Sequence, residues 1–138
     1  KKKLIDLVQR YRLSQKIKFI NHCREMPLAY SLADVVVSAS IEPEAFGRVS
    51  VEAQAMGKPI IASNIGGSKE TVLNKKSGFL YKHDDPRELA KNLNTVIELD
   101  QDTLNSIGNE GRKNIKKKFD VEAMCDSTLR EYKKLLDI

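Results

Sequence analysis

Residues 42–63 contain the side chains of this sequence whose types and spacing suit chemistry on a phosphorylated ligand. The segment follows an apolar stretch and carries Gly47 between two carboxylates, Glu44 and Glu52. A loop that ends a strand, followed by a Gly and the first turn of a helix, presents backbone N–H groups and a positive helix end to an anion. Carboxylates accept hydrogen bonds from hydroxyl groups. The pattern therefore predicts a nucleotide diphosphate site with polyol contacts on both sides of it.

Strand-like and helical segments alternate along the chain, which is typical of parallel sheets. Strands are expected at 17–20, 34–40, 58–63 and 78–81, and helices at 2–12, 27–33, 48–56, 68–73, 86–99, 101–117 and 121–136. Residues 35–37 are all Val, and a β-branched run without alternation favours a strand covered on both faces. We predict an α/β fold with a Rossmann-like parallel sheet and helices on both faces. Ligands of such sheets bind beyond the carboxyl ends of the strands, where Glu44 and Gly47 lie.

Some helix ends carry their own signals. Gly57 is placed to end the helix that begins after Gly47, because Gly readily adopts the left-handed conformation of a helix C-terminus. Asp84 or Asp85 is placed to cap the helix whose first residue is Pro86.

Composition bounds the class of protein. The 138 residues are 41% hydrophobic and 31% charged, which suits a single soluble globular domain over 1–138. No apolar run approaches the roughly 18 residues needed to span a membrane. The two cysteines and two histidines form no cluster of metal-type spacing, so we predict no metal site.

The net charge of +5 favours anionic partners. Lysine clusters at 1–3 and 116–118 carry much of this charge and suit either solvated helix faces or an anionic membrane surface. The four Tyr and four Phe do not interleave with basic residues as single-stranded nucleic acid would require. We therefore expect no nucleic-acid partner.

Around Glu44 and Glu52, the sequence resembles the retaining glycosyltransferases of the GT-B fold, family 4 type. The resemblance is carried by the E-x7-E spacing, the Phe-Gly inside it and the trailing EAQAMGKPIIAS, with LADVVVSAS before and IGGSKETV, SGFLY and DDPRELAKNL after. It covers nearly the whole chain, which is similar to the C-terminal, donor-binding domain without its first strands. The family's sheet order puts those strands between 17–20 and 34–40. We expect a gap in the sheet, and a chain that is marginally stable alone or self-associates.

The resemblance implies a role for each residue of the motif. Glu44, the candidate catalytic residue, contacts hydroxyls of the donor sugar near the reacting carbon. Glu52 accepts hydrogen bonds from the ribose hydroxyls, while backbone N–H groups at Phe46, Gly47 and Arg48 face the sugar and the diphosphate. The implied donor-binding set is Glu44, Ala45, Phe46, Gly47, Arg48 and Glu52.

Two further segments leave alternatives open. Asn21 and His22 occupy a loop where the family often meets the base. Asn-His-Cys stands where the family usually has a Gly, which favours an ordinary loop over contacts with the base. Gly66 and Gly67 suit either a loop that approaches the donor or a plain turn. Glu70 suits a structural carboxylate in the first turn of a helix.

The resemblance implies transfer of a sugar from a nucleoside diphosphate sugar to a glycan or lipid-linked acceptor, with retention, in bacterial lipopolysaccharide or surface polysaccharide synthesis. The donor serves as substrate, and no cofactor or metal is expected because a helix end and basic side chains stabilise the leaving group. The acceptor would bind another domain, so this chain alone is expected to be inactive. The expected location is cytoplasmic, with peripheral contact at the inner face of the cell membrane. The alternative is a non-catalytic nucleotide-binding or regulatory module.

Overall fold

The computed structural model describes residues 2–136, and at its centre is a sheet of three parallel strands. β1 (Val36–Ser38), β2 (Ile60–Ser63) and β3 (Gly78–Tyr81) lie in the order β1-β2-β3. Val36 is opposite Ile60, and Ile60 is opposite Gly78. The prediction of a parallel α/β sheet is confirmed, and the carboxyl ends of all three strands lie at one edge.

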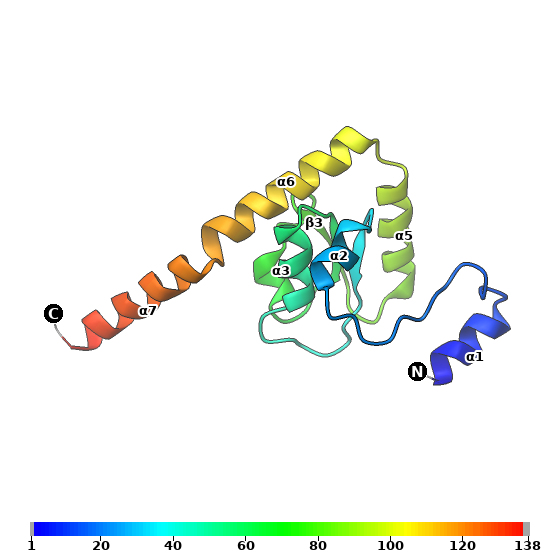
Figure 1. Cartoon of the computed structure of the whole chain (residues 1–138), viewed down its shortest axis with the longest axis horizontal. Coiled ribbons are helices and arrows are strands. Elements are labelled where there is room, and N and C mark those ends of the chain that lie inside the picture. The colour runs from blue at the N-terminus through cyan, green and yellow to red at the C-terminus, as the bar shows by residue number, and fades with distance from the viewer. Residues whose placement is uncertain (1, 137–138) are drawn as a thin grey trace.

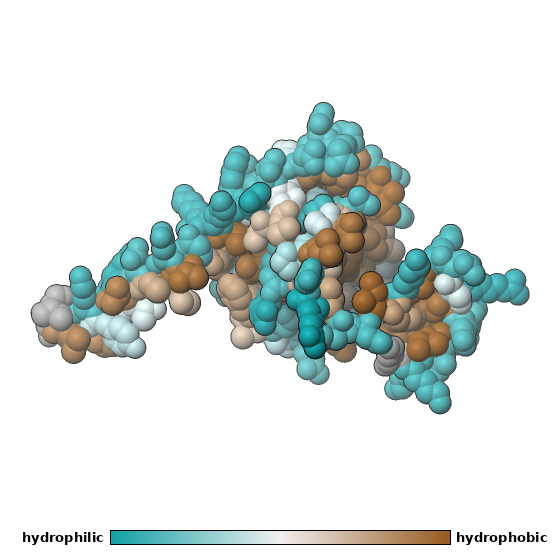
Figure 2. Space-filling view, in the orientation of Figure 1, coloured by the Kyte–Doolittle hydropathy of each residue, from teal (hydrophilic) through white to brown (hydrophobic). Residues whose placement is uncertain are grey.

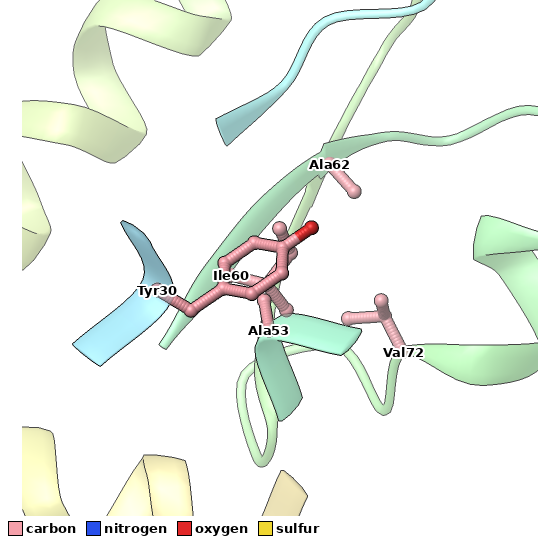
Figure 3. Close-up of a cluster of buried hydrophobic side chains, with 5 residues drawn as sticks. All are labelled: Tyr30, Ala53, Ile60, Ala62 and Val72. Carbon is pink, nitrogen blue, oxygen red and sulfur yellow. The ribbon is translucent and has the colours of Figure 1, made fainter. Parts of the chain in front are cut away.

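Helices cover both faces of the sheet because the central strand is apolar on both. Every residue of β2 is buried. On one face, β2 packs against α2 (Met26–Ser31) and α3 (Arg48–Ala55), and Figure 3 shows the side chains of this cluster. Its buried members are Tyr30, Ala53, Ile60, Ala62 and Val72.

On the opposite face, Ile61 of β2 packs with Tyr81 of β3 and with Val96 of α5 (Pro86–Ile97). The helix α5 begins as predicted, since the Asp85 side chain accepts hydrogen bonds from the backbone N–H groups of Arg87 and Glu88, both at 3.0 Å. The short helix α4 (Ser68–Thr71) lies between β2 and β3 in the chain.

The long helix α6 (Gln101–Lys118) packs on α3 through glycines. A Cβ at Gly108 would lie 1.9 Å from the carbonyl oxygen of Gly57, and one at Gly111 would lie 3.0 Å from Cγ of Gln54. Gly57, whose φ is +69°, follows the end of α3 as predicted. Because Gly108 and Gly111 have no side chain, the backbone of α6 comes into direct contact with the end of α3.

Two helices project from this body. Figure 1 shows α1 (Lys2–Arg10) and α7 (Val121–Leu135) at opposite ends of the molecule, with α7 continuing the line of α6. Neither helix has a buried residue, and the apolar side chains along both are visible in Figure 2. Of the lysine cluster at 1–3, Lys1 lies outside the described residues.

The predicted strand at 17–20 is wrong. These residues have no regular structure, and Ile20 is 81% exposed. A strand needs a neighbour for its backbone N–H and C=O groups, and within residues 2–136 no strand lies beside this segment. β1 is consequently an edge strand. The sheet described by residues 2–136 has no internal gap of the expected kind, because its three strands are hydrogen-bonded neighbours.

The expectation that residues 35–37 are covered on both faces is wrong for Val37, which is 38% exposed. The helix α5 lies over β2 and β3, so the end of β1 is left uncovered on that face. Elsewhere the predicted helices and strands are present, with ends that differ by a few residues because backbone hydrogen bonds, rather than sequence pattern, decide where an element stops.

The glycine contact between α6 and α3 generates a prediction on stability. Gly108→Ala places a methyl group against a backbone oxygen that no rotamer change can move, and overpacking of this kind costs about 1–3 kcal/mol. The better helix propensity of Ala offsets about 1 kcal/mol of that cost. Urea unfolding should therefore show a net loss for Gly108→Ala. Gly111→Ala is the matched control on the same helix, because its methyl would come no closer than 3.0 Å to the Gln54 side chain, whereas the methyl at position 108 would lie 1.9 Å from a backbone oxygen. Equal stability of the two variants would contradict the packing described here.

Candidate functional site

The loop that follows β1 lies directly beside the loop that follows β2. The backbone N–H of Gly67 donates to the carbonyl oxygen of Glu44 at 2.8 Å. A Cβ at Gly66 would lie 2.4 Å from that same carbonyl, and a Cβ at Gly67 would lie 2.4 Å from the carbonyl carbon of Phe46. Gly66 also has φ +55°. Both glycines are thus required where the two loops meet, and they hold residues 44–46 in place.

The helix α3 starts at this loop with an uncapped N-terminus. Gly47, the N-cap residue, is in the left-handed conformation at φ 74° and ψ 55°, and no side chain caps the helix. Gly47 is buried, so the backbone turns tightly into the helix at that point. The first turn of α3 therefore presents N–H groups and the positive end of the helix dipole at the carboxyl edge of the sheet, which is the geometry of an anion site.

A hollow on one side of this N-terminus contains Glu44. Its volume is about 520 Å³, and it is lined by Pro43, Glu44, Ala45, Gly66, Gly67, Lys69 and Glu70. The hydroxyl of Ser40 donates to Oε1 of Glu44. Oε2 of Glu44 can accept a hydrogen bond from a hydroxyl-bearing ligand in the hollow.

A second hollow, about 420 Å³ in volume, contains Glu52. Oε1 of Glu52 accepts from both Nη2 and Nε of Arg48, at 2.9 and 3.3 Å. Oε2 accepts from the Tyr30 hydroxyl at 2.9 Å. The hollow is lined by Arg24, Met26, Pro27, Tyr30, Arg48, Glu52, Ala55 and Met56. A mainly apolar lining that includes one carboxylate and two guanidinium groups suits a flat, partly apolar ligand that also carries hydroxyls and negative charge.

The surroundings of Tyr30 change its acidity. Burial, then the hydrogen bond to Glu52 and the negative charge of that carboxylate, raise the pKa of Tyr30 from 10.0 to about 12, although Arg48 acts in the opposite direction. The phenol therefore keeps its proton, and remains a hydrogen-bond donor, throughout the neutral range. Burial also raises the pKa of Tyr81, which lies in the other core cluster.

The structure places most of the residues that the sequence predicts to bind the donor along the two hollows. Glu44, Ala45, Gly66 and Gly67 line one hollow, and Arg48 and Glu52 line the other. Phe46, between them, is 44% exposed.

The ring of Phe46 contacts Phe119, which ends α6, edge to face with 5.7 Å between ring centroids. Asn21 and His22 lie in the irregular segment before α2, outside the lining of either hollow. Their contact with a base stays a prediction.

Sequence reasoning missed Tyr30, Arg24, Met26 and Lys69 as site residues. Tyr30 lies 22 residues before Glu52, and no periodicity or local spacing links residues so far apart. Lys69 is the second residue of α4, which begins directly after Gly67. It reaches the Glu44 hollow only because the loops after β1 and β2 are in contact.

Residues 1–114 match the family model described as glycosyl transferases group 1. The chain belongs to this family. CapM of Staphylococcus aureus, a capsular polysaccharide biosynthesis glycosyltransferase, is 35% identical over 95 residues, which are 64% of this chain and 25% of CapM.

Solved structures agree with this family. A glycosyltransferase from Rickettsia africae ESF-5 has a TM-score of 0.91 at 33% identity, covering 98% of this chain and 36% of that chain. The Anabaena protein HepE, crystallised in complex with UDP, has a TM-score of 0.90 at 32% identity, covering 96% of this chain and 36% of HepE. The sheet and its helices match the Rossmann-like C-terminal domains of GT-B glycosyltransferases. This group 1 chain thus spans about a quarter to a third of the length of these relatives.

Other features of this group 1 chain concern metal ions, membranes and thiols. Among residues 2–136, no three His, Cys, Asp or Glu side chains are grouped so as to hold a metal ion. In the same part of the chain, every helix is too short or too polar to cross a membrane. Cys23 and Cys125 are free thiols.

The contact of Gly66 and Gly67 with residues 44–46 leads to a prediction for this group 1 chain. The methyl group of Gly67→Ala should push the Phe46 backbone away, because it would lie 2.4 Å from the Phe46 carbonyl carbon. The φ angle of Gly67, −62°, suits any residue, so the cost of the substitution is steric alone. We expect the free energy of unfolding to fall by about 1–3 kcal/mol, the usual cost of overpacking. Gly57→Ala is the control: its φ of +69° imposes backbone strain, but nothing lies within 4 Å of its Cβ. Equal stability of Gly67→Ala and wild type in urea unfolding would contradict the role of Gly67.

The raised pKa of Tyr30 yields a prediction about pH. Because the folded-state pKa of about 12 lies above the ordinary value of 10.0, the stabilisation is complete below pH 10 and is lost as the pH rises through 12. The difference in unfolding free energy between wild type and Tyr30→Phe should therefore shrink across that window. Urea unfolding at a series of pH values measures it. A difference that stays constant would show that the phenol has an ordinary acidity.

Proposed function

We propose that this chain supplies the donor-binding half of an enzyme that transfers a sugar from a nucleoside diphosphate sugar to a glycan or lipid-linked acceptor, with retention of configuration. The observation that carries the proposal is a pair of hollows next to the uncapped N-terminus of α3, one lined by Glu44 of the preceding loop and the other by Glu52 of the helix itself. A nucleotide sugar has the same order of groups: a ribose diol, a diphosphate and a sugar polyol. Glu52, the helix N-terminus and Glu44 offer partners in that order.

The proposed chemistry follows from the charge that develops on the leaving group. As the bond between the anomeric carbon and the diphosphate oxygen breaks, its electron pair stays on the oxygen and the sugar becomes oxocarbenium-like. Fixed N–H dipoles at the start of α3 are aimed at this developing charge and lower the barrier. Glu44, beside the sugar, would orient its hydroxyls and act electrostatically on the positive sugar carbon.

Transfer of the sugar to the acceptor hydroxyl completes the reaction. In our proposal, the acceptor hydroxyl forms its bond on the face that the diphosphate leaves, which retains the configuration, and its proton passes to the departing diphosphate oxygen. The acceptor would be held by a domain outside residues 1–138, because the hollows of this chain are taken up by the donor. The relatives support a donor of this kind: HepE has been crystallised with UDP and, separately, with UDP-glucose.

A role in surface polysaccharide or lipopolysaccharide synthesis is part of the same proposal. It is supported by the similarity to CapM, a capsular polysaccharide biosynthesis protein. The lysines at 116–118, at the end of α6, would favour peripheral contact with an anionic membrane surface, where lipid-linked acceptors reside.

Titration calorimetry with UDP-glucose, GDP-mannose and ADP-glucose tests the donor site. We expect one donor to bind, and Glu52→Ala to weaken it roughly 10- to 100-fold, because hydrogen bonds to a charged group contribute about 1.5–3 kcal/mol. Glu110→Ala is the matched control, since Glu110 is also an ion-paired helical carboxylate but lies on α6. Wild-type affinity in Glu52→Ala would remove Glu52 from the donor site, and no binding of any donor by the full protein would overturn the proposal.

A further inference from the structure

The carboxylate of Glu52 is held from two sides by groups that differ in freedom. On one side, the Tyr30 ring is 5% exposed and packs in the core cluster with Ala53 and Ile60 (Figure 3). On the other, the Arg48 side chain is 83% exposed. A long exposed side chain keeps much of its rotamer freedom, and surface ion pairs contribute at most about 1 kcal/mol. The phenol is therefore the fixed partner of Glu52, and the guanidinium is the exchangeable one.

The fixed position of the phenol has two structural causes. Tyr30 lies in the last turn of α2, a helix that begins with Pro27 at its second position, and its ring is wedged between that helix and β2. In addition, Glu52 and Ala53 are adjacent on α3, so the residue that receives the hydrogen bond and the residue that packs on the ring belong to the same helical turn. The packing of the Tyr30 ring therefore places its hydroxyl within hydrogen-bonding distance of Glu52.

Counting lone pairs shows what each partner leaves for a ligand. A carboxylate offers about four acceptor positions, two on each oxygen. Tyr30 uses one position on Oε2, and Arg48 reaches Oε1 through two nitrogens. A ribose binds through two adjacent hydroxyls, which need one position on each oxygen at once. With Tyr30 in place, both oxygens can still face the diol once Arg48 has moved aside.

We infer that Tyr30 is a positioning residue for the ribose: its buried hydroxyl fixes the Glu52 carboxylate so that both oxygens face the 2′- and 3′-hydroxyls, and the exposed Arg48 side chain yields its place to the ligand. The inference rests on the proposed function, because it assumes that the ligand of Glu52 is the ribose of a nucleotide. It adds a residue from α2 to a site whose other members come from the loop and from α3. The high pKa of the phenol is consistent with a donor that never loses its proton at neutral pH.

The test is the ribose preference of the protein, defined as the dissociation constant of a 2′,3′-dideoxynucleoside diphosphate divided by that of the parent nucleotide. The probes are UDP, GDP and ADP with their dideoxy forms, titrated into the full protein, and the pair whose parent binds most tightly is used. Both members of a pair keep the base and the diphosphate, so the ratio reports the diol alone. A variant that merely loosens the fold weakens both members and leaves the ratio unchanged.

Tyr30→Phe keeps the buried ring and removes only the hydroxyl, and we expect its ribose preference to fall roughly two- to tenfold, the range of a single neutral hydrogen bond. Arg48→Ala should leave the preference at the wild-type value or above it. Glu52→Gln should lower it further than Tyr30→Phe does, and adding Tyr30→Phe to Glu52→Gln should produce no additional loss, because the phenol acts only through the carboxylate.

Three outcomes overturn the inference, and they separate it from the proposed function. A wild-type ribose preference in Tyr30→Phe, or equal weakening of both probes, removes the positioning role and leaves the donor site intact. A wild-type preference in Glu52→Gln overturns the ribose assignment on which both rest. Failure of every nucleotide to bind the wild-type protein overturns the proposed function and this inference together.

Discussion

The direct contact between the loops after β1 and β2 is the constraint on which the rest of the site depends. The backbone of residues 44–46 rests on Gly66 and Gly67 at distances that leave no room for a Cβ. This contact fixes where the loop ends and so where α3 begins. The N-terminus of α3, the Glu44 hollow and the direction of the helix that carries Glu52 all follow from that one point.

The position of α3 is then secured along its length by different interactions. Ala53 packs into the apolar core under Tyr30. The buried Gln54 donates through Nε2 to the carbonyl oxygens of Ser50 and Thr71, both at 3.0 Å. Asn114 of α6 donates to the same Thr71 oxygen at 3.1 Å, while the glycines of α6 lie against the end of α3. A helix held on three sides can present its free N-terminus to an anion without moving when the anion binds.

Core and site share residues in this domain. Tyr30 belongs at once to the apolar cluster on β2 and to the hydrogen bonds of Glu52. Phe46, in the loop between the two hollows, contacts Phe119 at the junction of α6 and α7. Through these two contacts, a change in the core or at that junction would reach Glu52 or the loop before α3 by way of a single side chain.

The sequence by itself determined the features that depend on residues close together along the chain. The apolar runs gave β2 and β3, Asp85 and Pro86 gave the start of α5, and the pattern around Gly47 gave a strand, a loop and a helix in the right order. Only the tertiary structure decided the rest. Residues 17–20 have strand-like residue types, but no strand lies beside them in the described part of the chain, and the hydrogen bond from Tyr30 to Glu52 joins positions 22 apart. Local pattern specifies backbone conformation, whereas pairing and side-chain contacts between distant segments exist only once the chain is folded, because they depend on which surfaces meet.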